Sequence, residues 1–242
     1  MNDRQAFIAT IAANLREADE LEQRAELTQR IGTEFNFRDK VKQLRTNTDA
    51  HLVYADWLEE QGDPLAELIR VSCQFTQHRW MRNIVERDYD ARDGVDAEWQ
   101  YGFDLCDRMQ TLQQQLNPFS DSVKVTWDRG LIVGMEIARE DYVVGGGPFI
   151  EMPICTLRLR DWHGIERSLP KNPAEALPWL FKLELPHDLV GREGTHVRDY
   201  DRLESTSLDD IVEAFGTLPN GKPRVRVEFT ERFNAEWNSR EV

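Results

Sequence analysis

The sequence predicts an α+β protein with a helical N-terminal half, containing a helical hairpin, and a small, mostly antiparallel sheet with a short helix in its C-terminal half. Up to Pro118, apolar residues recur at three- and four-residue steps, which is the pattern of amphipathic helices. Beyond Pro118, short runs rich in β-branched and aromatic residues follow one another, and such runs are typical of strands.

Composition places the chain among globular proteins. Of its 242 residues 40% are hydrophobic, and seven Trp and eleven Phe supply apolar area for a core. Forty-four acidic and thirty basic residues give a formal net charge of −14. This charge has the wrong sign for neutralising phosphates or anionic lipids, so neither nucleic acid nor a membrane is expected as a partner.

The sequence also predicts a cytoplasmic protein. The first residues contain no basic stretch followed by an apolar run, and no segment approaches about 18 consecutive apolar residues. The three cysteines, Cys73, Cys106 and Cys155, are widely separated and lack CxxC spacing. Such cysteines argue against a disulfide framework or a thiolate metal site, and a reducing compartment fits them best.

The first helices are predicted from apolar periodicity. A long helix is expected over residues 7–25 and a short one over residues 39–44. Thr48 or Asp49 is expected to cap a helix that continues to Glu60, because both side chains accept hydrogen bonds from free amides. Gly62 is expected to end that helix in a left-handed conformation.

The next helix begins at a second capping signal. Asp63 is the expected N-cap, and Pro64 occupies the first helical position, where its missing amide proton has no cost. The two helices joined here therefore form a tight hairpin. The second helix is expected to turn four residues inward: Leu65, Leu68, Ile69 and Ser72.

Pro118 is the predicted boundary between two regions. A helix is expected over residues 99–116, and it ends at Asn117 because a residue before proline avoids helical backbone angles. We therefore predict a helical region over residues 1–118 and an α+β sheet region over residues 119–242.

The sheet region is expected to start with a hairpin. Residues 123–127 and 131–137 are predicted strands, with Asp128, Arg129 and Gly130 as the turn between them. Three further strands and one helix follow. The strands are predicted at residues 154–160, 180–185 and 224–229, where charged and apolar residues alternate, and the helix begins after Ser207 and ends at Gly216. This alternation indicates that one face of the sheet is exposed to solvent.

Two separate pieces of sequence, and the helix that directly follows the second, carry a family resemblance. Residues 1–14 read MNDRQAFIATIAAN, residues 52–64 read LVYADWLEEQGDP, and residues 65–71 read LAELIRV. These pieces resemble the repeat-companion domain, a bacterial family abundant in planctomycetes and myxobacteria. The chain departs from that family at residues 15–50, where its relatives have a brief acidic spacer.

The resemblance covers roughly forty residues. It implies a scaffolding role without catalysis, because such domains often precede leucine-rich-repeat-like segments. Residues 127–132 and 155–159 also resemble the strands that follow the domain in its relatives. With no sustained repeat period and fewer than three units, the sequence does not predict a solenoid, and a short strand-and-helix layer stays an open alternative.

Two motifs that could carry function are interpreted as structural. Asp56 is expected to cap or pair with a neighbouring helix, and Trp57, three residues from Tyr54 on one helical face, is expected to be buried. The glycines at 145–147 precede Pro148 and lack the Lys and Ser or Thr of a phosphate-binding loop. We therefore interpret this segment as a connection.

No catalytic, cofactor-binding or metal-binding residue is predicted, and no cofactor is expected. The five histidines, His51, His78, His163, His187 and His196, form no HExxH or HxH motif, and no GxSxG sequence is present. His187 and His196 lie nine residues apart in a glycine-containing segment. A metal-dependent hydrolase with scattered site residues therefore stays open as an alternative.

The chain is accordingly predicted to be a non-catalytic protein–protein interaction or scaffold module and not an enzyme. Its partner is expected to be another protein, and the charge of −14 favours a basic one. An acidic immunity or inhibitor-type protein that blocks a basic partner is the second alternative. No oligomeric state is indicated.

Overall fold

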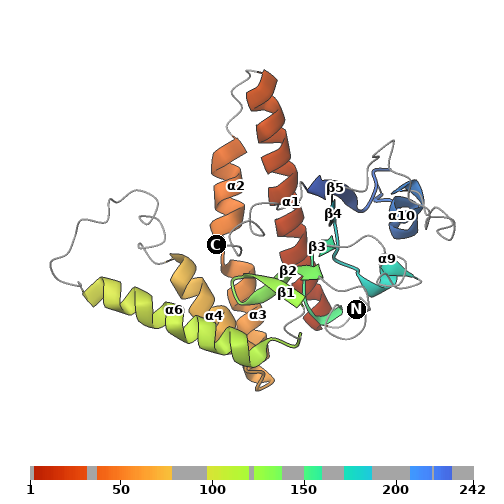
Figure 1. Cartoon of the computed structure of the whole chain (residues 1–242). Helices are drawn as coiled ribbons and strands as arrows, with labels where there is room; N and C mark the ends of the chain where they lie inside the picture. The colour runs from red at the N-terminus through yellow and green to blue at the C-terminus, as the bar shows by residue number, and fades with distance from the viewer. Residues whose placement is uncertain are drawn as a thin grey trace, which may run out of the picture. The chain divides into compact units, whose positions relative to one another are not determined.

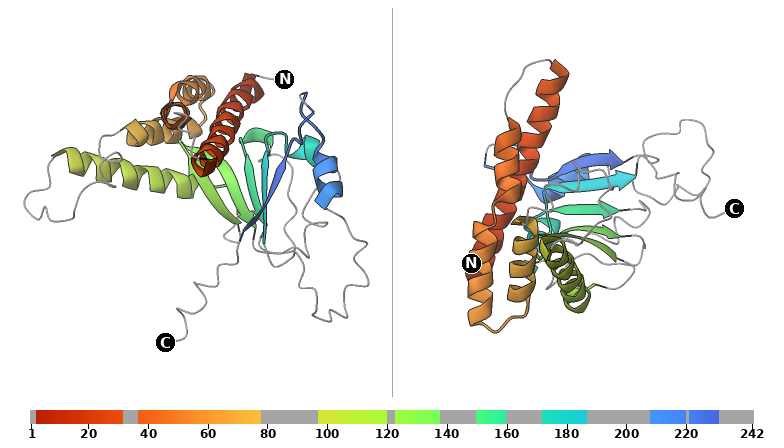
Figure 2. Two further views of the ribbon diagram at one scale, coloured as in Figure 1. Left: turned by 90° about the horizontal axis from the view of Figure 1, so that it is seen from above. Right: turned by 90° about the vertical axis from the view of Figure 1, so that its left-hand side faces the viewer.

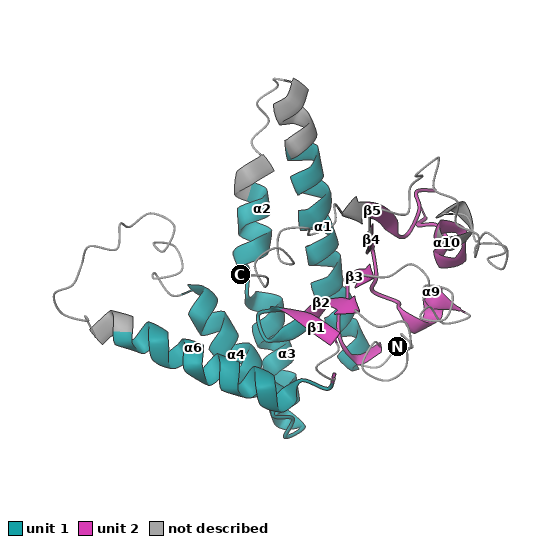
Figure 3. Ribbon diagram, in the orientation of Figure 1, with its two compact units in different colours: residues 1–118, 127–132 teal, residues 119–126, 133–242 magenta. Residues whose placement is uncertain are grey.

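The structure is a computed structural model that describes residues 3–31, 37–77, 97–119, 123–137, 150–159, 172–186, 208–219 and 221–230. It divides into two compact units (Figure 3). Unit 1 comprises Met1–Pro118 and Trp127–Ile132, and unit 2 comprises Phe119–Thr126 and Val133–Val242. Helices dominate the first unit and a five-stranded sheet the second, so the predicted α+β class is confirmed.

Unit 1 is built from five helices in its described part (Figure 1). Helix α1 packs on α2 and α3, α3 packs on α4, and α4 packs on α6. The apolar stripe predicted for the first helix lies buried, with Ile8, Ile11 and Leu15 at its centre. The bounds are α1 Asp3–Ile31, α2 Phe37–Thr46, α3 Asp49–Glu60, α4 Leu65–Gln77 and α6 Ala97–Leu116.

The hairpin of α3 and α4 forms as the sequence predicts. Gly62 adopts a left-handed φ of 69°, and Asp63 accepts a 2.9 Å hydrogen bond from the amide of Leu65. The expected inward residues of α4 are buried. At the start of α3 the capping oxygen comes from Asn47 instead of Thr48 or Asp49, because Asn47 Oδ1 accepts the amide of Asp49 at 2.9 Å.

Trp57 is half-buried, so the expectation that it is buried was wrong. Its ring lies beside those of Phe7 and Tyr54, with centroids 6.0 Å from each. Tyr54 is fully buried and takes the central position. The aromatic face was therefore predicted correctly, but the inner place on it belongs to Tyr54.

The tip of the predicted hairpin belongs to unit 1. Arg129 and Gly130 have φ angles of 47° and 83°, the combination of a type I′ turn, which matches the twist of the two strands that it joins. Gly130 lies against the backbone of α4, where an added Cβ atom would stand 2.6 Å from Ile69 Cα. Leu131 and Ile132 follow the turn and are fully buried.

Unit 2 contains the rest of a five-stranded sheet whose spatial order is β1-β2-β3-β4-β5, the order along the chain (Figure 2). The two-residue connection makes β1 and β2 antiparallel. The pairings β2–β3, β3–β4 and β4–β5 are parallel, which corrects the expectation of a mostly antiparallel sheet. The strands are β1 Val123–Asp128, β2 Leu131–Ile137, β3 Thr156–Leu159, β4 Lys182–Pro186 and β5 Arg226–Thr230.

Parallel order was not predicted because alternation along a strand does not reveal its direction. A parallel pair needs a long crossover, and the register shows how far apart in sequence the paired residues lie. Gly134 pairs with Thr156, Thr156 with Lys182 and Lys182 with Arg226, so successive strands are offset by 22, 26 and 44 residues. Two short helices, α9 Pro173–Ala176 and α10 Leu208–Phe215, lie within these crossovers and pack on each other.

Apolar and charged side chains lie on opposite faces of the sheet, as the alternation predicts, but the charged face is not fully exposed to solvent, because Glu184 is 6% exposed. One face of β3 and β4 buries Leu157, Leu159, Leu183 and Leu185, and the other carries charged side chains. Helix α6 ends at Leu116 and β1 begins at Val123; the boundary at Pro118 stays a prediction. No described helix is long and apolar enough to cross a lipid bilayer.

Candidate functional site

The charged face of the sheet in unit 2 is one candidate surface. Four charged residues of this face pair in register on neighbouring strands: Glu136 on β2, Arg158 on β3, Glu184 on β4 and Glu228 on β5. Side chains two residues earlier on the strands, Lys182 and Arg226, add two cations to the same face. We call these six residues the charge ladder.

Each member of the charge ladder contacts the next, and acids alternate with bases. Arg158 lies 3.7 Å from Glu136 and 2.5 Å from Glu184. Lys182 lies 2.8 Å from both Glu184 and Glu228. Arg226 closes the series, 2.5 Å from Glu228. With three acids and three bases, the ladder carries no net charge.

Burial differs along the charge ladder. The side chain of Glu184 is 8% exposed and that of Arg158 is 39% exposed. Burial alone raises the pKa of Glu184, but hydrogen bonds from Lys182 and Arg158 outweigh it, and the net pKa is lowered. Burial likewise acts to lower the pKa of Lys182, and its bonds to Glu184 and Glu228 raise it. Glu184 and Lys182 are therefore both charged at neutral pH.

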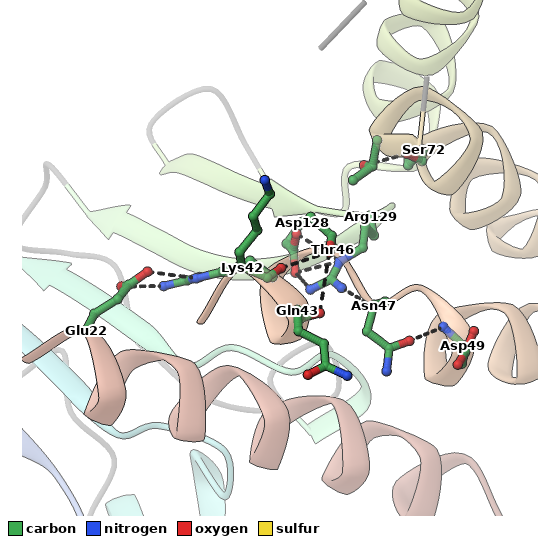
Figure 4. Close-up of polar contacts among 11 residues, drawn as sticks. Glu22, Lys42, Gln43, Thr46, Asn47, Asp49, Ser72, Asp128 and Arg129 are labelled. Atoms are coloured by element: carbon green, nitrogen blue, oxygen red, sulfur yellow. Dashed lines mark hydrogen bonds and ion pairs between the residues drawn. The ribbon is translucent and has the colours of Figure 1, made fainter. Parts of the chain in front are cut away.

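A buried polar cluster surrounds the β-turn in unit 1 (Figure 4). The side chain of Arg129 is 3% exposed, and its Nη2 lies 2.6 Å from Asp128 Oδ2. Its Nη1 donates to the main-chain carbonyl of Asn47, directly after the end of α2. A cation at the carboxyl end of a helix satisfies a free carbonyl and interacts favourably with the helix dipole. Arg129 therefore joins the turn to the junction of α2 and α3.

Two further residues near this guanidinium have strongly shifted pKa values. Burial, assisted by Arg129, lowers the pKa of His51 to about 4 against the opposing effect of Asp128. Burial raises the pKa of Cys73 to about 12, against the opposing effect of Arg129. At neutral pH the imidazole is uncharged and the thiol is protonated. The protonated thiol of Cys73 is therefore unsuited to nucleophilic catalysis, which needs a thiolate.

Two polar side chains of the buried cluster, those of His51 and Ser72, have no hydrogen-bond partner in the described part of the chain. Neither ring nitrogen of His51 is bonded, and the hydroxyl of Ser72 is not bonded either. Thr48, in contrast, accepts a 2.6 Å hydrogen bond from Gln77 Nε2, which connects the start of α3 with the end of α4. The hydrogen bonds of this cluster therefore connect helices α2, α3 and α4 and the β-turn at Arg129.

The motifs singled out from sequence fall in different places. Asp56 is exposed and pairs with Arg70 at 2.7 Å, as expected of a helix-pairing acid. The segment at 145–147 and four histidines, His78, His163, His187 and His196, lie outside the described residues. Cys73 and Cys155 are buried thiols, and Cys106 is partly buried. Within the described ranges no three His, Cys, Asp or Glu side chains come together as metal ligands.

Sequence reasoning did not find the charge ladder or the Arg129 cluster. The alternation in β3 and β4 indicated a charged face, but its pairings depend on a parallel register across long crossovers. The turn at Asp128–Gly130 was predicted, but its docking on α4 depends on tertiary contacts that no local pattern encodes.

Comparisons of the chain with protein-family models, with curated proteins and with solved structures find no match.

Proposed function

We propose that the chain is a non-catalytic protein–protein interaction or scaffold module. The observation that carries the proposal is the sequential parallel order of β2, β3, β4 and β5, with offsets of 22 and 26 residues between the first three. Leucine-rich repeats advance by 20–29 residues per strand and present their strands as a binding surface. The charge ladder lies on the corresponding strands of this sheet.

The resemblance of the N-terminal pieces to repeat-companion domains supports the same proposal. Such domains often precede leucine-rich-repeat-like segments, and here a strand layer follows the helices. Residues 15–50, where the family has a spacer, contain the rest of α1 and helix α2, which pack on each other. The departure from the family is thus an added pair of packed helical segments.

Site-specific photo-cross-linking tests the proposal. Thr126 is exposed on β1, and its side chain lies over Gly134, on the face that carries the charge ladder. A photoreactive residue at Thr126 is expected to cross-link one discrete protein in a lysate of the source cells. Thr217, exposed outside the sheet, is the matched control. Equal labelling from both positions, or labelling from neither, contradicts a binding role for this face.

An acidic immunity or inhibitor-type protein is the second candidate function. It is favoured by the hairpin of α3 and α4, where six acidic residues accompany a single basic one, Arg70, between Asp49 and Gln77. Such an excess attracts a basic partner from a distance and speeds its association.

A further inference from the structure

A shallow groove of about 420 Å³ lies at the hairpin of α3 and α4, beside α6. Pro64, Ala66 and Val71 are apolar residues of its lining. The charged lining residues are Glu59 on α3, Asp63 before α4, Glu67 and Arg70 on α4, and Arg108 on α6.

The two arginines of this groove are already held by carboxylates. Arg108 donates from Nε and Nη2 to a single oxygen of Glu67, at 2.9 and 2.5 Å. The Nη2 of Arg70 lies 2.7 Å from Asp56 and 2.6 Å from Glu59. Neither guanidinium is therefore available to an incoming anion without breaking an ion pair.

Three acids, Glu59, Asp63 and Glu67, and two bases, Arg70 and Arg108, line the groove, so the lining carries one net negative charge. Asp56, outside the lining, shares the guanidinium of Arg70 with Glu59, so these two carboxylates are only half neutralised. Glu60 follows Glu59 along α3 and is exposed. A lysine or arginine side chain is the group that complements such a lining, because its stem can cover apolar surface while its head reaches the carboxylates.

From this geometry we infer that the groove docks a basic segment of the partner protein, with one lysine or arginine at Glu59 and aliphatic side chains over Pro64, Ala66 and Val71. The inference rests on the proposed interaction role and names the chemistry of its partner.

A fluorescein-labelled peptide of alternating lysine and leucine residues is the probe for this site. Its anisotropy is titrated with the full chain at about 0.05 M and 0.15 M salt, where screening lengths differ. We expect Glu59→Gln with Glu67→Gln to weaken binding about tenfold, as expected when two carboxylates near a bound cation are neutralised. A glutamate–leucine peptide is expected not to bind.

The matched control is Glu20→Gln with Glu213→Gln. Both residues are exposed, and the pair changes the net charge by the same amount as the groove pair. It should alter binding less than about twofold. Equal weakening by the two pairs would show non-specific attraction to an acidic chain and overturn the inference, as would an absence of binding by the unsubstituted chain.

A second measurement uses the unsubstituted chain, so that it tests the groove even if the groove variant fails to fold. Amide resonances of Gly62, Ala66 and Val71 should shift when the lysine peptide is added, and shifts elsewhere alone would refute the groove. The cross-link from Thr126 tests the interaction role independently of the groove. If it persists while the groove binds no lysine peptide, the interaction role stands and only the basic docking segment is refuted.

Discussion

Replacing Gly130 by alanine tests whether the β-turn is docked on α4 as the structure shows. The added Cβ atom would lie 2.6 Å from Ile69 Cα, 2.7 Å from Ile69 N and 2.9 Å from Leu68 C. All three are main-chain atoms, so no side-chain rotation relieves the overlap. Forced overpacking costs about 1–3 kcal/mol, and a φ of 83° adds about 1 kcal/mol for a residue with a Cβ atom. We expect a total loss of about 2–4 kcal/mol.

Urea unfolding followed by circular dichroism measures this loss, and a thermal scan should show a midpoint lower by roughly 5–15 °C for a chain of this size. Gly62→Ala is the matched control, because its φ is also positive, at 69°, but nothing lies within 4 Å of the added atom. It should lose only about 1 kcal/mol. If the two variants lose the same free energy, the close approach of the turn to α4 is refuted.

Four further outcomes are expected. Arg129→Met should destabilise the fold by about 2–4 kcal/mol in urea, because Asn47 loses its charged donor and Asp128 loses its partner in a buried setting. The pKa of His51 is about 4 in the folded chain and 6.5 in the unfolded chain, so its contribution to the free energy of unfolding is complete above pH 6.5 and is lost as the pH falls toward 4. In His51→Gln the free energy of unfolding should fall by up to about 3 kcal/mol less over this pH range. Trp57→Ala should cost about 1–3 kcal/mol, less than the 3–5 typical of a fully buried aromatic residue, and an unchanged urea midpoint would count against its place beside Tyr54. No retention of DNA or RNA is expected in filter binding at 0.15 M salt, because the net charge of −14 opposes phosphate.

Local chemistry accounts for the parts of the fold that were predicted. The cap at Asp63, the stop at Gly62 and the end of α6 at Leu116 depend on residues within one turn of each element. The first two strands were placed from β-branched and aromatic residues on either side of a turn and the other three from alternation, and both patterns depend only on neighbouring residues. Such features can be read from sequence because the interactions that determine them are short in range.

The direction of the strands and the content of the candidate sites depend on distant residues. Arg158 and Glu184, 26 residues apart in sequence, meet only because the chain returns in parallel register. Arg129 reaches Asn47 across 82 residues. An arginine in a turn ordinarily points into water, so nothing local distinguishes the buried Arg129 from an exposed one, and its role became visible only in the folded chain.

The two candidate surfaces differ in their electrostatics, and this difference indicates which of them a partner uses. The charge ladder is neutral and internally paired from Glu136 to Arg226, so it exerts little attraction at a distance, and docking on it should depend weakly on salt. The hairpin of α3 and α4 keeps an excess of negative charge around Glu59, so docking there should be fast at low salt. As the screening length falls from about 10 Å at 0.1 M to about 3 Å at 1 M, that association rate should fall steeply. A partner whose association rate ignores salt therefore uses the ladder, and one whose rate collapses uses the groove.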